Sequence, residues 1–152
     1  MVYIIIIAAI LLGEWKIKSY IEQKKDFNTR EFYCKGKILV QKYHNKGVAL
    51  NILEKHVTLV KVITGTVIGI LLVLLGMLIG KREHKLYALG MSLLIGGALS
   101  NFIDRIHRGY VVDYFSFNVG KKLKHIVFNL ADMFVILGSI LIVIAEMLGR
   151  KK

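Results

Sequence analysis

Four long apolar stretches divide the chain, and polar, mostly basic segments separate them. The stretches cover residues 2–21, 62–80, 86–103 and 126–148. A helix rises ~1.5 Å per residue, so about 20 apolar residues cross a hydrocarbon core of ~30 Å. We therefore predict a membrane all-α fold, with four transmembrane helices in a single integral membrane domain over residues 1–152.

The first stretch carries two charged residues four positions apart, Glu14 and Lys18. This spacing places both on one face of a helix, where opposite charges form a stabilising pair. From this segment alone, we interpret them as an interfacial pair, whose long side chains extend to the membrane surface. The helix is expected to continue past them to residue 21.

The polar chain between the first two helices predicts a small subdomain outside the membrane. Residues 22–61 are too many for a simple connection between helices. The elements expected in this segment are a strand over 37–43, a turn over 44–47 and a short amphipathic segment over 48–53. A second segment outside the membrane is expected over residues 104–125.

Composition and charge favour a membrane protein with basic flanks. Hydrophobic residues make up 55% of the chain, against ~45–50% in soluble domains, and the formal net charge is +12. The basic residues flank apolar stretches, which suits anionic lipid headgroups better than nucleic acid. Lysines lie on both predicted sides, so charge alone leaves the orientation open. The two halves do not repeat each other, which disfavours an inverted-repeat transporter.

The end of the third helix carries a polar stripe. Asn101 and Asp104 are three residues apart and share one face, and Arg105 lies beside it. We expect Asp104 and Arg105 to pair with each other and cap the helix end, since buried charges usually need a partner. On the same helix, the small residues Gly96 and Ser100 predict the close approach of another helix.

Two further aspartates are candidates for catalysis. Asp113 lies among apolar neighbours in an alternating segment, residues 110–115, which reads as a short strand. No cation is close to it in the sequence, so we expect it to be partly desolvated, with its proton affinity raised. Asp132 is three residues after Asn129 and precedes a long uncharged run, so it lies at or below the membrane surface. Both segments reach the same membrane side and can converge.

Two converging carboxylates predict metal-free peptide hydrolysis. Close carboxylates do not both ionise easily, so the ionised one takes a proton from water and the protonated one donates to a carbonyl oxygen. The groups that could hold the pair or the substrate backbone are Asn45, Asn101, Asn129 and Arg105.

Other functions fit the residues less well. The five histidines are scattered without an HExxH pattern, so we expect no metal, and no G-x-S-x-G motif surrounds a serine. A proton or cation carrier would place carboxylates near the middle of the spans, whereas these lie at the ends. A catalytically silent membrane protein that binds lipidated proteins stays open as the alternative.

The order of motifs resembles the lipoprotein signal peptidase (signal peptidase II) family of four-helix membrane aspartyl peptidases. The similar stretches are Glu14 to Lys18 (Asp-x-x-x-Lys in the family), Asn45 to Val48 (Asn-x-Gly-Ala), Ser100 to Arg105 (Gly-Asn-x-x-Asp-Arg), Gly109 to Tyr114 (Gly-x-Val-x-Asp-Phe) and Phe128 to Asp132 (Phe-Asn-x-Ala-Asp, unchanged). The departures are Glu14 for Asp, Val48 for Ala, Leu50 for Phe, Ser100 for Gly and Tyr114 for Phe.

This resemblance implies that Asp113 and Asp132 are the catalytic pair. The residues implied to bind substrate or support the pair are Glu14, Lys18, Asn45, Gly47, Asn101, Asp104, Arg105 and Asn129. It also implies cleavage before the lipidated cysteine of diacylglyceryl-modified prolipoproteins, without a cofactor. The implied location is the bacterial cytoplasmic membrane, with both termini on its cytoplasmic side. The active site would lie on the outer side, together with a small β platform and a short surface helix. We expect a monomer that contacts membrane phospholipids and no nucleic acid.

Overall fold

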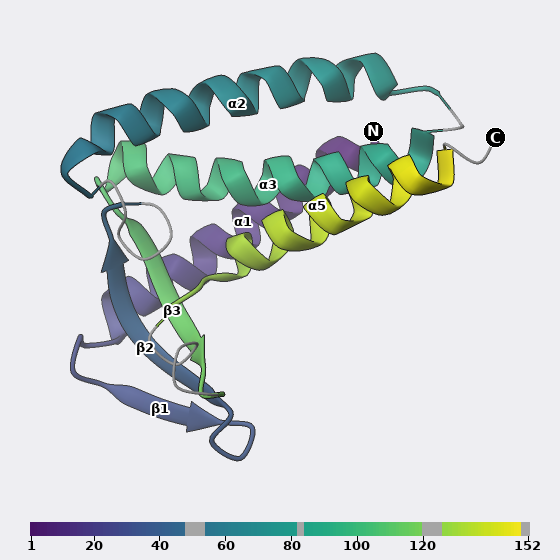
Figure 1. Ribbon diagram of the computed structural model, residues 1–152. Helices are drawn as coiled ribbons and strands as arrows, with labels where there is room; N and C mark the ends of the chain where they lie inside the picture. The colour runs from purple at the N-terminus through teal and green to yellow at the C-terminus, as the bar shows by residue number, and fades with distance from the viewer. Residues whose placement is uncertain (48–53, 82–83, 120–125, 150–152) are drawn as a thin grey trace.

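The computed structural model describes residues 1–47, 54–81, 84–119 and 126–149. These residues form four long helices and a three-stranded sheet at one end of them (Figure 1). The helices are α1 (Val2–Lys24), α2 (Val57–Leu78), α3 (Lys85–His107) and α5 (Leu130–Gly149), with a short 3-10 helix, η2 (Glu54–His56), before α2. The strands are β1 (Arg30–Tyr33), β2 (Ile38–Asn45) and β3 (Val111–Phe117). The amphipathic segment expected over 48–53, and with it the implied surface helix, lies outside the described residues.

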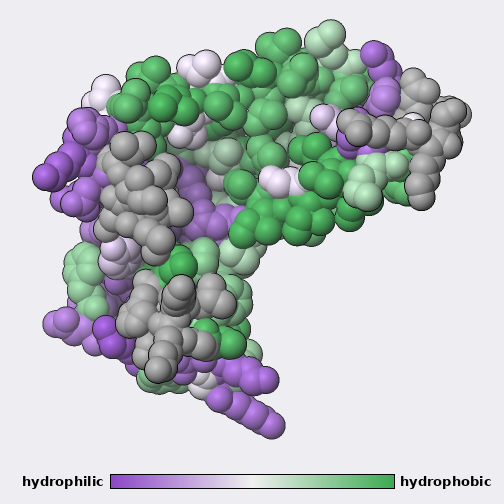
Figure 2. Space-filling view, viewed as in Figure 1, coloured by the Kyte–Doolittle hydropathy of each residue, from purple (hydrophilic) through white to green (hydrophobic). Residues whose placement is uncertain are grey.

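Three helices in the described part of the chain are long and apolar enough to cross a membrane, namely Glu54–Leu78, Lys85–His107 and Leu130–Gly149. The fourth, α1, is 23 residues long but carries Glu14, Lys16 and Lys18 in its second half. Apolar side chains gather over the helices and polar ones over the sheet (Figure 2). This division agrees with a membrane protein that has a small sheet outside the apolar layer.

The sheet is antiparallel, with strand order β1-β2-β3. The two predicted strands are confirmed as parts of β2 and β3, whereas the short β1 was not predicted. The turn expected over 44–47 is wrong for His44 and Asn45, which continue β2 opposite Val112 and Val111. This pairing extends β2 until Asn45 lies beside the strand that carries Asp113.

The helices differ in extent from the predicted apolar stretches, most importantly at the end of α3 and the start of α5. The third helix runs past residue 103 to His107, so Asp104 and Arg105 are helical. The fourth helix begins at Leu130 because the chain before it pairs with β3. There, Phe128 donates its N–H to Phe115 O at 2.7 Å, and its carbonyl accepts the N–H of Tyr114 at 2.8 Å. An apolar run of residues does not by itself distinguish such a paired segment from a first helical turn.

Glycines allow α3 to lie very close to its neighbours. A Cβ added at Gly97 would lie 2.3 Å from the carbonyl oxygen of Ala131 in α5, and one at Gly96 would lie 2.8 Å from Ile10 in α1. The close approach predicted at Gly96 is thereby confirmed. Since Ala131 directly precedes Asp132, the contact at Gly97 sets how near α5 brings this aspartate to α3.

We expect Gly97→Ala to destabilise the protein by about 1–3 kcal/mol, because the added methyl overlaps the Ala131 carbonyl and forces α3 and α5 apart. The free energy of unfolding in detergent measures this effect. Gly69→Ala in α2 is the control, since nothing lies within 4 Å of a Cβ there. Equal stability of the two variants would contradict the close contact.

Candidate active site

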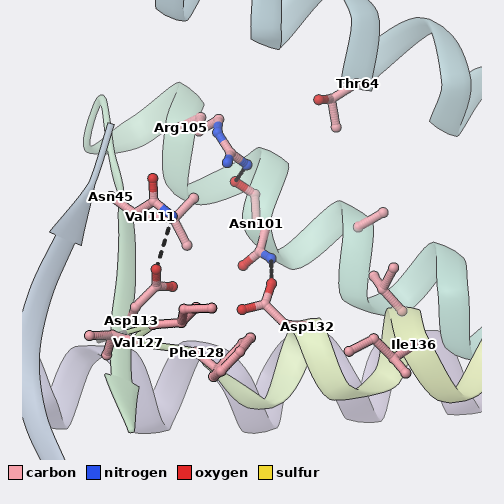
Figure 3. A pocket seen from close by; sticks show the side chains of 13 residues that line it. Asn45, Thr64, Asn101, Arg105, Val111, Asp113, Val127, Phe128, Asp132 and Ile136 are labelled. Carbon is pink, nitrogen blue, oxygen red and sulfur yellow. Dashed lines mark hydrogen bonds between the residues drawn. The ribbon is translucent and has the colours of Figure 1, made fainter. Parts of the chain in front are cut away.

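A cavity of about 360 Å³ lies between the sheet and helices α2, α3 and α5 (Figure 3). Its polar lining consists of Asn45, Thr64, Asn101, Arg105, Asp113 and Asp132. The remaining wall is apolar and includes Val111, Phe128 and Ile136. The cavity therefore combines two carboxyl groups and two side-chain amide groups with a hydrophobic surround.

The first of these carboxyl groups belongs to Asp113, which is 2% exposed in β3. Its Oδ1 accepts the side-chain N–H of Asn129 at 2.6 Å, and its Oδ2 accepts that of Asn45 at 3.0 Å. Burial, assisted by the charge of Asp132, raises the pKa of Asp113 to about 7 against the opposing effect of the two amide bonds. The expected desolvation of Asp113 is confirmed.

The second carboxyl group, that of Asp132, lies in the first turn of α5. Asn129 and Asp132 bond reciprocally at the helix start: the N–H of Asp132 donates to Asn129 Oδ1 at 2.9 Å, and the N–H of Asn129 donates to Asp132 Oδ2 at 3.1 Å. This capping arrangement starts the helix at Leu130 and fixes the Asp132 carboxyl at its positive end. Asn101 donates a further hydrogen bond to Asp132 Oδ1 at 2.8 Å.

Asn129 joins the two aspartates. Its side-chain nitrogen donates to Asp113 Oδ1 and, at 3.1 Å, to Asn101 Oδ1, while its side-chain oxygen caps the helix that carries Asp132. The predicted convergence of the two segments is therefore seen in the structure, with both carboxyl groups reaching one cavity (Figure 3).

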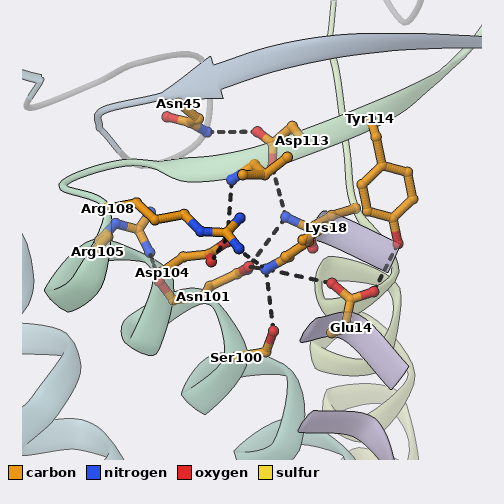
Figure 4. Close-up of polar contacts among 12 residues, drawn as sticks. Glu14, Lys18, Asn45, Ser100, Asn101, Asp104, Arg105, Arg108, Asp113 and Tyr114 are labelled. Atoms are coloured by element: carbon orange, nitrogen blue, oxygen red, sulfur yellow. Dashed lines mark hydrogen bonds and ion pairs between the residues drawn. The ribbon is translucent and has the colours of Figure 1, made fainter. Parts of the chain in front are cut away.

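Behind this network lies a buried ionic cluster of Glu14, Lys18 and Asp104 (Figure 4). The ammonium of Lys18 lies 3.4 Å from Glu14 Oε2 and 3.0 Å from Asp104 Oδ2. It also donates to Asn101 Oδ1 at 2.8 Å and to Ser100 Oγ at 3.2 Å. The interfacial interpretation of Glu14 and Lys18 is wrong, because α3 supplies enough partners to bury the lysine.

The expected pair between Asp104 and Arg105 does not form between these described side chains. Asp104 instead pairs with Lys18, lies 3.6 Å from Arg108, and accepts the N–H of Val112 at 3.2 Å. Arg105 donates to the carbonyl oxygen of Gly47 at 2.7 Å and lines the cavity. Neighbouring residues on a helix point in different directions, which separates their partners.

Two residues at the site were not predicted as site residues from the sequence, of which Thr64 lines the cavity and Tyr114 lies behind it. Thr64 comes from α2 and lies across the cavity from the aspartates (Figure 3); its only signal was a polar side chain within the uncharged stretch 62–80. Tyr114 places its hydroxyl 2.7 Å from Glu14 Oε1, and its signal was that both residues depart from the family pattern. Within the described ranges, no three His, Cys, Asp or Glu residues form a metal-holding group. The two carboxyl groups in the cavity can take up and donate protons.

Comparison with known proteins links the chain to one family. Residues 5–148 match the model of "Signal peptidase (SPase) II". Among curated relatives, a lipoprotein signal peptidase of Halothermothrix orenii is 36% identical over 95% of this chain and 93% of the relative, and one of Lactiplantibacillus plantarum is 33% identical over 94% and 92%. Another, of Clostridium tetani, is 39% identical over 66% and 63%.

Solved structures agree with this match. Two bacterial membrane enzymes determined by the in meso method superpose with TM-scores of 0.80 and 0.76, at 27% and 28% identity. The first alignment covers 96% of this chain and 87% of the neighbour, and the second covers 95% and 91%.

Proposed function

This chain belongs to the signal peptidase II family of peptidases, and on that premise we propose that it is a membrane aspartic endopeptidase. Its substrates are diacylglyceryl-modified prolipoproteins, and it removes their signal peptide by cutting before the lipidated cysteine. The observation that carries the proposal is the pair of buried aspartates, Asp113 and Asp132, which reach one cavity and are joined through Asn129. The naming of the relatives as lipoprotein signal peptidases supports the substrate class.

In the proposed mechanism, Asp113 carries the proton and Asp132 the negative charge. The raised pKa of Asp113 favours its protonated form near neutrality, and the start of α5 favours a negative charge on Asp132. Asp132 takes a proton from water, which attacks the scissile carbonyl, while Asp113 donates its proton to the carbonyl oxygen. Asn45, Asn101, Asn129 and Arg105 orient the two carboxyls or the substrate backbone.

We propose four membrane spans, with α1 as the fourth. Its 23 residues have the required length, and the burial of Glu14 and Lys18 removes two of its charges from contact with lipid. Both termini then lie on the cytoplasmic side of the bacterial cytoplasmic membrane, and the sheet and the aspartates lie on its outer side. The acyl chains of the substrate lie against the apolar helices, so that the scissile bond reaches the cavity. The enzyme works as a monomer among membrane phospholipids.

A cleavage assay in detergent or liposomes tests the function. The purified protein is given one prolipoprotein with and without the diacylglyceryl group on its cysteine, in the presence of a chelator. We expect cleavage of the lipidated form alone. Binding of the lipidated form without cleavage would favour the silent binder, and a requirement for added zinc would contradict the aspartic mechanism.

The rate is expected to depend on the proton of Asp113. Because its pKa is raised to about 7, Asp113 keeps its proton below that pH and loses it as the pH rises. Above about pH 7 both carboxyls become ionised and no proton is available for the carbonyl oxygen, so kcat/KM should fall. A pH–rate profile between about pH 5 and 9 measures this, and a rate that climbs steadily to pH 9 would contradict it.

A further inference from the structure

The hydroxyl of Tyr114 joins three elements of the fold behind the cavity (Figure 4). Tyr114 directly follows Asp113 in β3, and successive side chains of a strand point to opposite faces, so Tyr114 points away from the cavity toward α1. Its hydroxyl donates to Glu14 Oε1 at 2.7 Å and accepts the N–H of Leu130 at 3.0 Å. Both Tyr114 and Glu14 are buried, at 6% and 2% exposure.

The bond from Leu130 ties this hydroxyl to the helix that carries Asp132. Leu130 is the first residue of α5, and the N–H groups of a first helical turn have no partner within the helix. The backbone N–H of Tyr114 also donates to the carbonyl of Phe128 at 2.8 Å. Tyr114 therefore contacts the chain on both sides of Asn129, which lies three residues before Asp132.

A second route leads from Glu14 to the same aspartate. Glu14 pairs with Lys18, Lys18 donates to Asn101 Oδ1, and Asn101 donates to Asp132 Oδ1. Glu14 thus touches both the hydroxyl that holds the start of α5 and the ammonium that orients Asn101. A shift of either contact is passed on to Asp132 through one buried ion pair and two partly buried hydrogen bonds.

We infer that Tyr114 is a positioning residue that acts as a unit with Glu14, holding the first turn of α5 and thereby the carboxyl of Asp132. The unit requires both side chains. A phenylalanine at 114 has no hydroxyl to donate, and an aspartate at 14 is one methylene too short to keep the 2.7 Å bond. The two departures at these positions therefore compensate each other in this chain.

The test rests on the proposed peptidase activity and compares Tyr114→Phe, Glu14→Asp and the double variant. Each single substitution is expected to lower kcat about tenfold and to leave KM within about twofold, because Asp132 is misplaced while the substrate-binding wall is kept. The kcat of the double variant should be no lower than that of the less active single variant, because the effects of residues that act as a unit do not add.

Tyr110→Phe is the matched control. The Tyr110 hydroxyl donates to Glu22 Oε1 at 3.2 Å, so it also connects α1 with the chain at β3, but this bond does not reach α5. Its removal should leave kcat unchanged. Hydrogen exchange at the amide of Leu130 gives a readout without substrate: we expect faster exchange in Tyr114→Phe and wild-type exchange in Tyr110→Phe.

Three results would overturn the inference: wild-type kcat in Tyr114→Phe, equal losses in the two tyrosine variants, or losses that multiply in the double variant. If Tyr114→Phe does not fold, Glu14→Asp carries the same test, because it breaks the same bond and keeps the tyrosine ring. A wild-type protein that cleaves nothing would instead refute the proposed function, and the exchange at Leu130 would still decide whether the link exists.

Discussion

Asp113→Asn and Asp132→Asn are each expected to lower kcat by about a thousandfold while the protein stays folded. An amide nearly matches the shape of the carboxyl group but can neither take a proton from water nor give one to a carbonyl oxygen, and such transfer contributes ~10²–10⁴-fold. At Asp113, the bonds to Asn45 and Asn129 can partly survive the change. The loss should therefore be one of chemistry rather than of structure.

The measurement is turnover of a lipidated prolipoprotein, with thermal unfolding recorded on the same preparations. Asp26→Asn makes the same substitution at an exposed position between α1 and β1 and should turn over like wild type. Near-normal turnover in either variant of the pair would show that this residue is not part of the reaction.

Lys18→Met is expected to cause the largest loss of stability, about 3–5 kcal/mol in the free energy of unfolding. Its ammonium lies among two carboxylates, a hydroxyl and an amide oxygen, with a side chain that is 1% exposed. Removal of the charge leaves Glu14 and Asp104 buried without their common cation, and breaking one partner of a buried ion pair costs this much.

Lys16→Met is the matched control for this prediction. Lys16 lies two residues away on α1 and is exposed, so its loss should change stability by less than about 0.5 kcal/mol. Chemical denaturation in detergent measures both variants. If Lys18→Met unfolded at the same denaturant concentration as Lys16→Met, the buried cluster would not stabilise the fold.

Much of the helical frame could be predicted because it follows from local pattern. The uncharged runs that became α2, α3 and α5 are visible as stretches of sequence, and Asp113 and Asp132 stand out because carboxyl groups are costly beside such runs. Asn45 was predicted as a group that could hold the two aspartates, but no spacing along the chain places it beside Asp113, since 68 residues separate them.

The rest depended on contacts between distant segments. A Glu–Lys pair four residues apart looks the same whether it faces water or the interior, and only the partners on α3 decide between these. The start of α5 was misjudged because Phe128 pairs with β3 through its backbone, and the backbone is the same for every residue. The bond between Tyr114 and Glu14 joins positions 100 residues apart, which no local pattern reveals.

The burial of Lys18 has a consequence for the order in which the protein is made. The α1 segment emerges from the ribosome before α3, and the hydroxyl and amide oxygens that receive its ammonium come 82 and 83 residues after Lys18. Until α3 has been synthesised, Lys18 has only Glu14 as a buried partner. The first helix therefore completes its docking only after the third has arrived, and a chain stopped before α3 should hold α1 less firmly in the membrane.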